Sequence, residues 1–146
     1  MKVSGKSRQM TFKATGKDKN YFFRAYDRNS IHITAEKYIP NAGPNHKAEY
    51  ERYLGEYADA SSDNYIYIHV WDWYKGWNIS VKEGSKTLTV EDLGKGKDPL
   101  YMISNMVRKC NVADNGSYTL DMYPQNCQHI FRVKASSATS TVIITV

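Results

Sequence analysis

The four histidines, His32, His46, His69 and His129, have the side chains best suited to metal binding or proton transfer. A two-metal hydrolytic centre needs clustered His, Asp and Asn side chains to bridge its cations and activate water. No two of these histidines lie within ten residues of each other, and the sequence contains no Gly-Asp, Gly-Asn-His or Gly-His-x-His string. We therefore predict no catalytic residue, no metal ligand and no cofactor site in this chain.

The sequence also lacks the usual signatures of covalent catalysis by a nucleophile and of phosphate binding. There is no Gly-x-Ser-x-Gly elbow, and Gly94-Lys95-Gly96-Lys97 is too short for a phosphate-binding loop. Cys110 and Cys127 have no Cys-x-x-Cys partner or nearby His, so they do not predict a zinc site. Two separate buried thiols are favoured, because free Cys is among the most buried residue types, and a disulfide between them is the alternative.

The strongest candidate for binding is a run of aromatic residues within positions 65–77. Tyr and Trp present flat amphipathic surfaces that stack on sugar rings, nucleobases or a partner domain. The candidates for interdomain or ligand contact are Tyr67, His69, Trp71, Trp73, Tyr74 and Trp77. The alternative is that Tyr67, Trp71 and Trp77 fill the space between two sheets, with Tyr74 exposed at a turn. For His69, a packed and hydrogen-bonded imidazole is favoured over a general base.

These aromatic residues lie in a segment whose alternation predicts a strand. In Tyr65–Trp73 the aliphatic Ile66, Ile68 and Val70 fall on one face and the aromatic residues and His69 on the other, since strand side chains have a period of two. After a turn at 74–76, Trp77–Lys82 alternates again with Trp77 inward. We predict an antiparallel hairpin of these two strands, extended by Thr87–Val90 to a three-stranded meander.

The rest of the chain is predicted from similar local signals. Further strands are expected at Thr11–Ala14 and Tyr21–Ala25, which would form a hairpin, and at Ser30–Thr34, Gln128–Ala135 and Thr141–Val146. Helices are expected at Asn45–Leu54 and Pro99–Cys110, the second with Asp98 as its N-cap. Together these elements predict a mainly β, single-domain fold over residues 1–146, with sandwich-like antiparallel sheets and one or two short helices.

Charge and hydropathy argue against two classes of partner. The net charge is +5, but the excess lies in residues 1–24, which carry seven basic side chains and one acidic side chain. Nucleic-acid binders usually carry their basic residues on the folded body, so we predict no nucleic-acid partner. No apolar run approaches the roughly 18 residues that cross a bilayer, so no membrane span is expected.

Several blocks of the sequence resemble the C-terminal domain of calcineurin-like phosphoesterases of the Bacteroidetes type. The blocks are Tyr21–Ser30, Asn64–Trp73 with its Trp-Asp-Trp end, Gly76–Val81, Asp98-Pro99-Leu100 and His129–Ser137. They run in order across nearly the whole chain.

This resemblance implies a non-catalytic C-terminal accessory module of a larger metal-dependent phosphoesterase. In that family the metal-binding motifs belong to a central phosphoesterase domain, and none of them matches a position here, so no catalytic residue is carried over. The implied partner is that domain, and the implied location is the periplasm or the cell surface. A β-sandwich module that binds carbohydrate or glycan through its aromatic face is the alternative.

Overall fold

The computed structural model places the chain in two compact units. It describes residues 3–4, 7–13, 17–19, 23–71, 73, 75–109 and 126–146, with side chains for 23–71, 73, 75–104 and 126–146. The β-unit comprises residues 1–30, 61–96 and 128–146. The helical unit comprises residues 31–60 and 97–127. Each unit is thus assembled from segments that are distant in the sequence.

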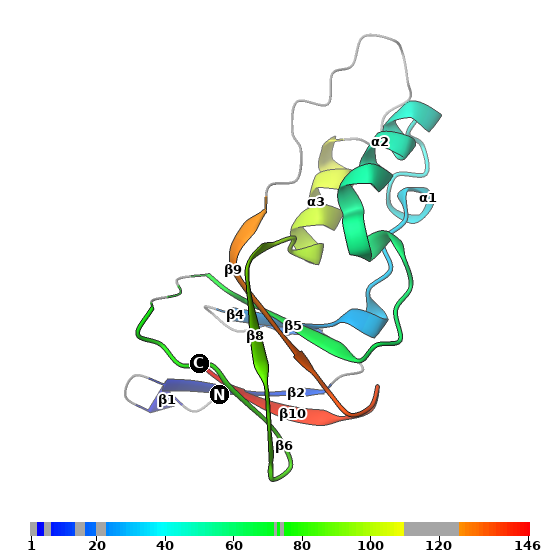
Figure 1. The fold of residues 1–146 in the computed structure, drawn as a ribbon. Coiled ribbons are helices and arrows are strands. Elements are labelled where there is room, and N and C mark those ends of the chain that lie inside the picture. The colour runs from blue at the N-terminus through cyan, green and yellow to red at the C-terminus, as the bar shows by residue number, and fades with distance from the viewer. Residues whose placement is uncertain are drawn as a thin grey trace. The chain divides into compact units, whose positions relative to one another are not determined.

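The first sheet of the β-unit has five strands in the order β1-β2-β10-β6-β7. The strands are β1 (Val3–Ser4), β2 (Ser7–Lys13), β10 (Thr141–Thr145), β6 (Ser80–Glu83) and β7 (Lys86–Leu88). The C-terminal strand β10 lies in the middle and pairs antiparallel with both β2 and β6. Residues near the two ends of the sequence are therefore hydrogen-bonded neighbours in this sheet (Figure 1).

The second sheet has the order β3-β4-β5-β9-β8. Its strands are β3 (Lys17–Lys19), β4 (Phe23–Asp27), β5 (Tyr65–Val70), β9 (Cys127–Lys134) and β8 (Val90–Gly96). In the central antiparallel pairs, Ile68 of β5 lies opposite Ala25 of β4 and Phe131 of β9. This register puts apolar residues of three strands on one face, because strand side chains alternate.

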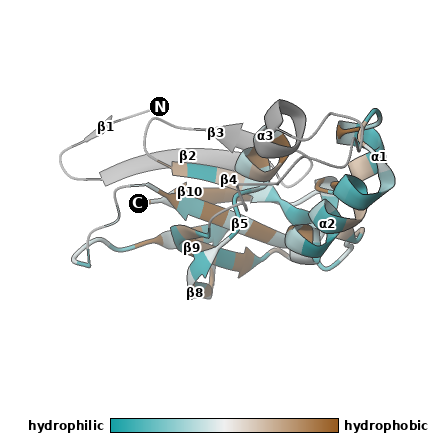
Figure 2. Cartoon of the chain, turned by 90° about the horizontal axis from the view of Figure 1, so that it is seen from above, coloured by the Kyte–Doolittle hydropathy of each residue, from teal (hydrophilic) through white to brown (hydrophobic). Residues whose placement is uncertain are grey.

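The core of the β-unit contains the inward residues of both sheets, and Figure 2 shows hydrophobic residues recurring along β5 and β10. The second sheet contributes Phe23, Ala25, Ile66, Ile68, Val70, Phe131 and Val133. The first sheet contributes Val81, Leu88, Val142 and Ile144. Such interdigitation of two inner faces is typical of a β-sandwich. The prediction of a mainly β fold with two antiparallel sheets and short helices is confirmed, whereas the extent of a single domain stays a prediction.

The predicted hairpin of Tyr65–Trp73 with Trp77–Lys82 is wrong. Strand β5 ends at Val70 and pairs with β4 and β9, whereas β6 begins at Ser80 and belongs to the other sheet. The meander is wrong too: β7 does pair with β6, but it ends at Leu88, and β8 then joins the second sheet. Alternation identifies strands and inward residues but carries no information about which strand is the neighbour, and here the successive strands β5 and β6 belong to different sheets.

Two N-terminal predictions are also wrong. Strands β2 and β4 lie in different sheets, so Thr11–Ala14 and Tyr21–Ala25 do not form a hairpin, and a further strand, β3, lies between them in the sequence. Ser30–Thr34 is not a strand, because the 3₁₀ helix η1 (Arg28–Ser30) ends there and Thr34 caps the next helix. Ile31 and Ile33 are nevertheless buried together, as their alternation predicted, in the core of the helical unit.

The helical unit contains α1 (Ala35–Tyr38), α2 (Pro44–Leu54), the 3₁₀ helix η2 (Gly55–Ala58) and α3 (Pro99–Lys109). Its buried core is formed by Ile31, Ile33, Ala35, Ile39, Ala42, Tyr50, Leu54, Tyr57 and Met102. The Tyr57 hydroxyl donates a hydrogen bond of 2.9 Å to the Lys97 carbonyl, which joins the two sequence segments of the unit. This core was not predicted from the sequence, since only two of its helices were expected.

Both predicted helices are confirmed almost to the residue. Helix α2 starts one residue before the prediction, with Pro44 in its first turn, where proline is tolerated because its missing N–H needs no partner. Helix α3 begins at Pro99, and the Asp98 carboxylate accepts hydrogen bonds from the backbone N–H groups of Leu100 and Tyr101. Asp98 is therefore the predicted N-cap. The predicted final residue of α3, Cys110, lies outside the described residues.

A polar loop joins β9 to β10 and therefore connects the two sheets. Within it, the Ser136 backbone N–H and hydroxyl both donate to the Glu83 carboxylate of β6, at 3.1 and 2.8 Å. Hydrogen bonds from the side chains of Ser140 and Ser136 lower the pKa of Glu83 below its ordinary value of 4.5. The ionised carboxylate is therefore the form that stabilises this connection.

Replacement of Glu83 by Gln is expected to make stability less dependent on acid pH. Because the folded pKa is lowered, the contribution of Glu83 is complete above the ordinary value of 4.5 and is lost as the pH falls through the folded value. The variant should be less stable than the wild type by under about 1 kcal/mol at neutral pH, since solvent competes for exposed hydrogen bonds. Urea unfolding at several pH values should show this gap closing below pH 4.5. Glu51→Gln, at an exposed position of α2, is the control, and an equal pH profile for both variants would contradict the assignment.

Candidate interface residues

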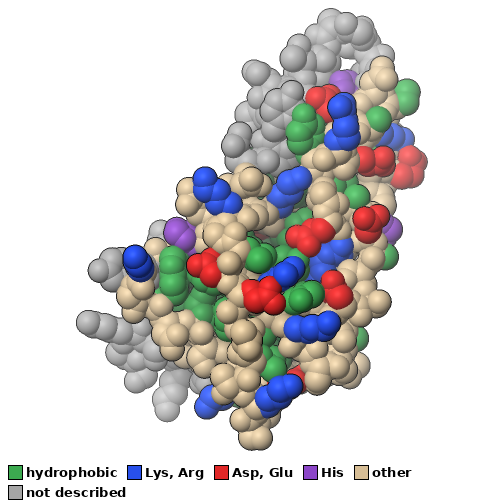
Figure 3. Space-filling model, viewed as in Figure 1, with side chains coloured by type: hydrophobic (Ala, Val, Ile, Leu, Met, Phe, Trp, Pro, Cys, Tyr) green, Lys and Arg blue, Asp and Glu red, His purple; other side chains and the backbone are tan. Residues whose placement is uncertain are grey.

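Basic and acidic side chains are interspersed on the face of the molecule shown in Figure 3, with hydrophobic side chains between them. No large area of a single charge is visible on this face. Among the described residues, no three His, Cys, Asp or Glu side chains lie close enough together to hold a metal ion. The helices in the described part of the chain are all too short or too polar to cross a bilayer.

Tyr67 and His69 lie on the face of β5 that points away from the sandwich core. Tyr67 is 4 % exposed and His69 is 8 % exposed, so neither offers an open ring surface. The cross-strand neighbours of His69 are Arg24 on β4 and Ile130 on β9. Its imidazole meets the Trp71 indole edge to face, with 6.2 Å between ring centroids. The His69 ring is therefore buried and in contact with an aromatic ring, and the preference for a packed histidine over a general base stays a prediction.

Trp71 follows the last residue of β5 and is half-buried. The Arg24 guanidinium carbon lies 4.9 Å from the centroid of its ring, which is within the range of a cation–π contact. Trp71 also packs at the margin of the β-unit core. The Trp71 side chain thus lies between the core of the β-unit and the Arg24 guanidinium.

Trp73 and Trp77 form a separate aromatic pair. The Trp73 ring packs edge to face on Phe131, a core residue, at a centroid distance of 5.0 Å. Trp77 then packs edge to face on Trp73 at 6.4 Å and is 37 % exposed. The prediction that Trp77 points inward is therefore wrong, because Trp77 lies three residues before β6 and packs on Trp73, whereas Ile79 does pack against the core with Val81.

The five candidate residues that the structure describes thus do not share one aromatic face. The period of two ends with β5 at Val70, so Trp73 reaches the core side of the sheet while Tyr67 and His69 lie on the opposite side. The side chain of Tyr74 lies outside the described residues. Of the candidates that the structure describes, Trp77 is the one with substantial exposed surface.

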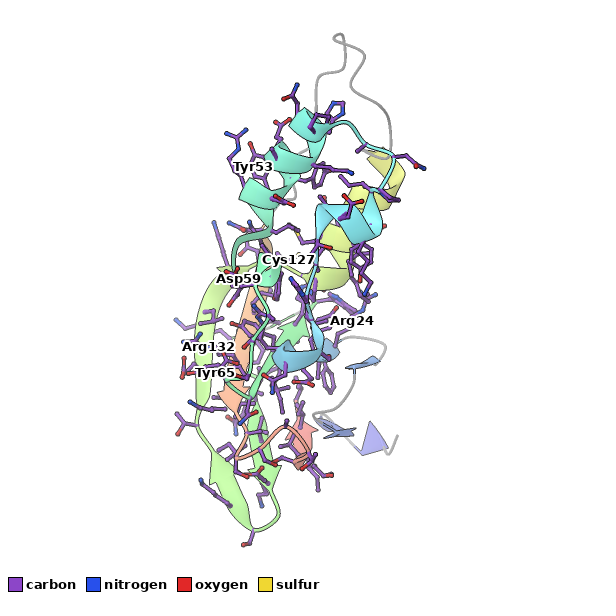
Figure 4. The ribbon with its side chains drawn as sticks, turned by 90° about the vertical axis from the view of Figure 1, so that its right-hand side faces the viewer. Arg24, Tyr53, Asp59, Tyr65, Cys127 and Arg132 are labelled. Atoms are coloured by element: carbon purple, nitrogen blue, oxygen red, sulfur yellow. The ribbon has the colours of Figure 1, made fainter. Side chains whose placement is uncertain are left out.

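A cluster on β5, β8 and β9 was not identified as a site from the sequence. The Arg132 guanidinium lies 4.4 Å from the centroid of the Tyr65 ring, and Lys134 Nζ lies 5.6 Å from the same ring. Arg132 Nε also donates to the Glu91 carboxylate at 2.7 Å (Figure 4 labels Tyr65 and Arg132, which lie side by side). Hydrogen bonds to Glu91 and Tyr67 raise the pKa of Arg132 still further, so the group is a permanent cation. The register of β9 against β5 places Arg132 opposite Tyr67, and the Glu91 contact requires β8 to lie beside β9, so neither contact can be read from the alternation of the sequence.

Burial also changes the pKa of Asp27 and of Cys127. Desolvation raises the pKa of Asp27, whose carboxylate accepts a hydrogen bond from the Asn29 backbone N–H at 3.0 Å. Cys127 carries a free, half-buried thiol, and its pKa is raised by desolvation and by the nearby Asp98 carboxylate. A thiol with a raised pKa is a poor nucleophile, because the thiolate is the reactive form. Cys110, the other half of the predicted alternative disulfide, lies outside the described residues.

Comparison with known proteins identifies a family. No curated protein and no solved structure is significantly similar to this chain. The family model described as the C terminal of calcineurin-like phosphoesterase matches residues 1–146. The match spans the two sheets, the helical unit and the aromatic segment between β5 and β6. The chain therefore belongs to the family of C-terminal domains of calcineurin-like phosphoesterases.

Proposed function

We propose that this chain is a non-catalytic accessory domain that docks on the phosphoesterase domain of a metal-dependent phosphoric ester hydrolase. Two observations support the proposal. The family match covers residues 1–146, and the sequence contains none of the strings that carry metal ligands in the catalytic domain. In this proposal the chemistry, including the metal ions, belongs to the partner domain, and this chain supplies a folded surface.

The exposed Trp77 is the single observation that carries the docking role. Its indole is 37 % exposed, yet it packs against Trp73, which in turn packs on the core residue Phe131. An aromatic side chain held in this way binds with little loss of conformational entropy and offers a large apolar area. Binding energy in protein interfaces is commonly concentrated in such Trp residues.

The docking role predicts an effect of Trp77→Ala on domain association. Titration of the chain into its phosphoesterase domain, followed by calorimetry, should show binding that the variant weakens by tenfold or more, which corresponds to about 1.4 kcal/mol. Leu93→Ala is the matched control, since Leu93 is a similarly exposed hydrophobic residue, at 36 %, in the same unit. Equal affinities for the two variants, or no binding by the wild type, would contradict the proposal.

The absence of catalysis is tested with the chain alone. Incubation with p-nitrophenyl phosphate and added manganese, zinc or iron should give no turnover above the rate with metal alone. The phosphoesterase domain under the same conditions is the positive control. Turnover that follows the chain through purification would refute the accessory role.

The type and the location of the parent protein are inferred from the resemblance of the sequence blocks to the family. We propose a parent protein of the Bacteroidetes type that is located in the periplasm or at the cell surface. The carbohydrate alternative has less support, since two residues of the predicted aromatic face, Tyr67 and His69, are buried. Binding to a glycan array that Trp73→Ala abolishes, with folding intact, would revive that alternative.

A further inference from the structure

Two arginines lie on the same face of the second sheet, one on each side of β5. Arg24 is on β4 opposite His69, and Arg132 is on β9 opposite Tyr67. Each guanidinium stacks on an aromatic ring, Trp71 for Arg24 at 4.9 Å and Tyr65 for Arg132 at 4.4 Å. Figure 4 labels both arginines. The two pairs therefore share one arrangement and can be compared directly.

The two arginines differ in their hydrogen-bond partners. Arg132 Nε donates to the Glu91 carboxylate at 2.7 Å, so this cation has its counter-ion within the fold. Arg24 Nε is buried and has no hydrogen-bond partner. Arg24 also has no ion pair with any residue in the described part of the chain. Within the described part of the chain, Arg24 thus has no carboxylate that corresponds to the Glu91 partner of Arg132.

A buried N–H group without a partner is uncommon in folded proteins, and each instance calls for an explanation. The aromatic ring holds the guanidinium in place but does not replace a hydrogen-bond acceptor. Arg24 as a whole is half-buried. Of its nitrogens, Nε alone is buried without a partner. An acceptor can therefore approach the other nitrogens of the guanidinium from solvent. A guanidinium that is already oriented loses little entropy when it binds a planar carboxylate with two parallel hydrogen bonds.

We propose that Arg24, held by Trp71, is the receptor for an Asp or Glu carboxylate of the phosphoesterase domain. The inference rests on the proposed docking function and adds an electrostatic contact to the aromatic one at Trp77. A fixed cation in an interface sets the register of the two surfaces and rejects partners that do not present an acid at that position.

The test is the affinity of the chain for its phosphoesterase domain at two salt concentrations. Arg24→Glu should weaken binding by tenfold or more, because it places two carboxylates face to face, whereas Arg24→Lys should weaken it less. Lys82→Glu makes the same change in net charge at an exposed position of the other sheet and should change affinity by less than about threefold. Circular dichroism and thermal unfolding of each variant will separate loss of folding from loss of contact, and Arg24→Gln is the substitute if Arg24→Glu does not fold.

The outcomes separate this inference from the docking function. Wild-type binding that Trp77→Ala weakens and Arg24→Glu leaves unchanged would overturn the carboxylate receptor and keep the docking role. Equal losses for Arg24→Glu and Lys82→Glu would show a general effect of charge and would also overturn it. If replacement of one Asp or Glu by Arg in the phosphoesterase domain restores the binding that Arg24→Glu weakens, that residue is the acid that Arg24 binds. No binding by the wild type would refute both proposals.

Discussion

Replacement of Phe131 by Ala is expected to lower the free energy of unfolding by about 3–5 kcal/mol. Phe131 is 4 % exposed and lies between Ile68 of the neighbouring strand and the Trp73 ring. The variant loses the apolar burial of the ring and leaves a cavity that β5 and β9 can fill only in part. It also removes the support of the Trp73–Trp77 pair.

Tryptophan fluorescence during urea unfolding will measure this effect, because Trp71, Trp73 and Trp77 all lie in the β-unit. The control is Ile143→Ala on β10, where the side chain is 36 % exposed and the expected loss is about 1 kcal/mol or less. A loss for Phe131→Ala that is no larger than the loss for Ile143→Ala would show that the two sheets do not share the core described here. Weaker domain docking by Phe131→Ala is a further expected consequence, since Trp77 would lose its platform.

Replacement of Leu54 by Ala is expected to cost about 2–5 kcal/mol in the stability of the helical unit. Leu54 is the last residue of α2 and is fully buried with Tyr50, one turn earlier, and Met102 of α3. Helix α2 buries a narrow stripe that also includes His46, so few other contacts can compensate for the lost side chain.

Far-ultraviolet circular dichroism is the appropriate probe for this variant, because α1, α2 and α3 all lie in the helical unit. Arg52→Ala, on the exposed side of the same helix, is the matched control and should change stability by less than about 0.5 kcal/mol. Equal stability of the two variants would mean that α2 does not depend on the core formed by residues 31–57 and Met102.

Helix ends were predictable because their signals are local. Asp98-Pro99 carries both the capping carboxylate and the proline of the first turn, and Gly55 follows the last residue of α2. These groups act on backbone atoms only a few residues away, so no knowledge of the rest of the fold is needed. The buried positions of the strands were predictable for the same reason, as Ile66, Ile68 and Val70 show.

Strand partners were not predictable from the sequence. The chain passes repeatedly between the two sheets. Strands β4 and β5 belong to the second sheet, β6 and β7 to the first sheet, and β8 and β9 to the second sheet again. A turn signal such as Gly76 is equally compatible with a hairpin and with a crossing between sheets. Pairing is decided by the total burial that each arrangement allows, which is a property of the whole chain.

Only part of the candidate interface was predictable from the sequence. The sequence pointed to the aromatic run, but the end of β5 at Val70 decided that Trp73 and Trp77 form a supported pair while Tyr67 and His69 are buried. The contrast between Arg24 and Arg132 could not be predicted, because Glu91 reaches Arg132 only when β8 lies beside β9.

The sequence by itself determined the fold class, the two longer helices, the inward residues of the strands and the resemblance to phosphoesterase C-terminal domains. These depend on periodicity, on caps and on strings of residues that are read over short distances. The tertiary structure decided which strands pair, that residues 31–60 and 97–127 form a unit of their own, and which aromatic and cationic side chains remain accessible. The physical reason is that accessibility and pairing depend on contacts between residues far apart in the chain, such as Glu91 with Arg132 and Asn64 with Ala135.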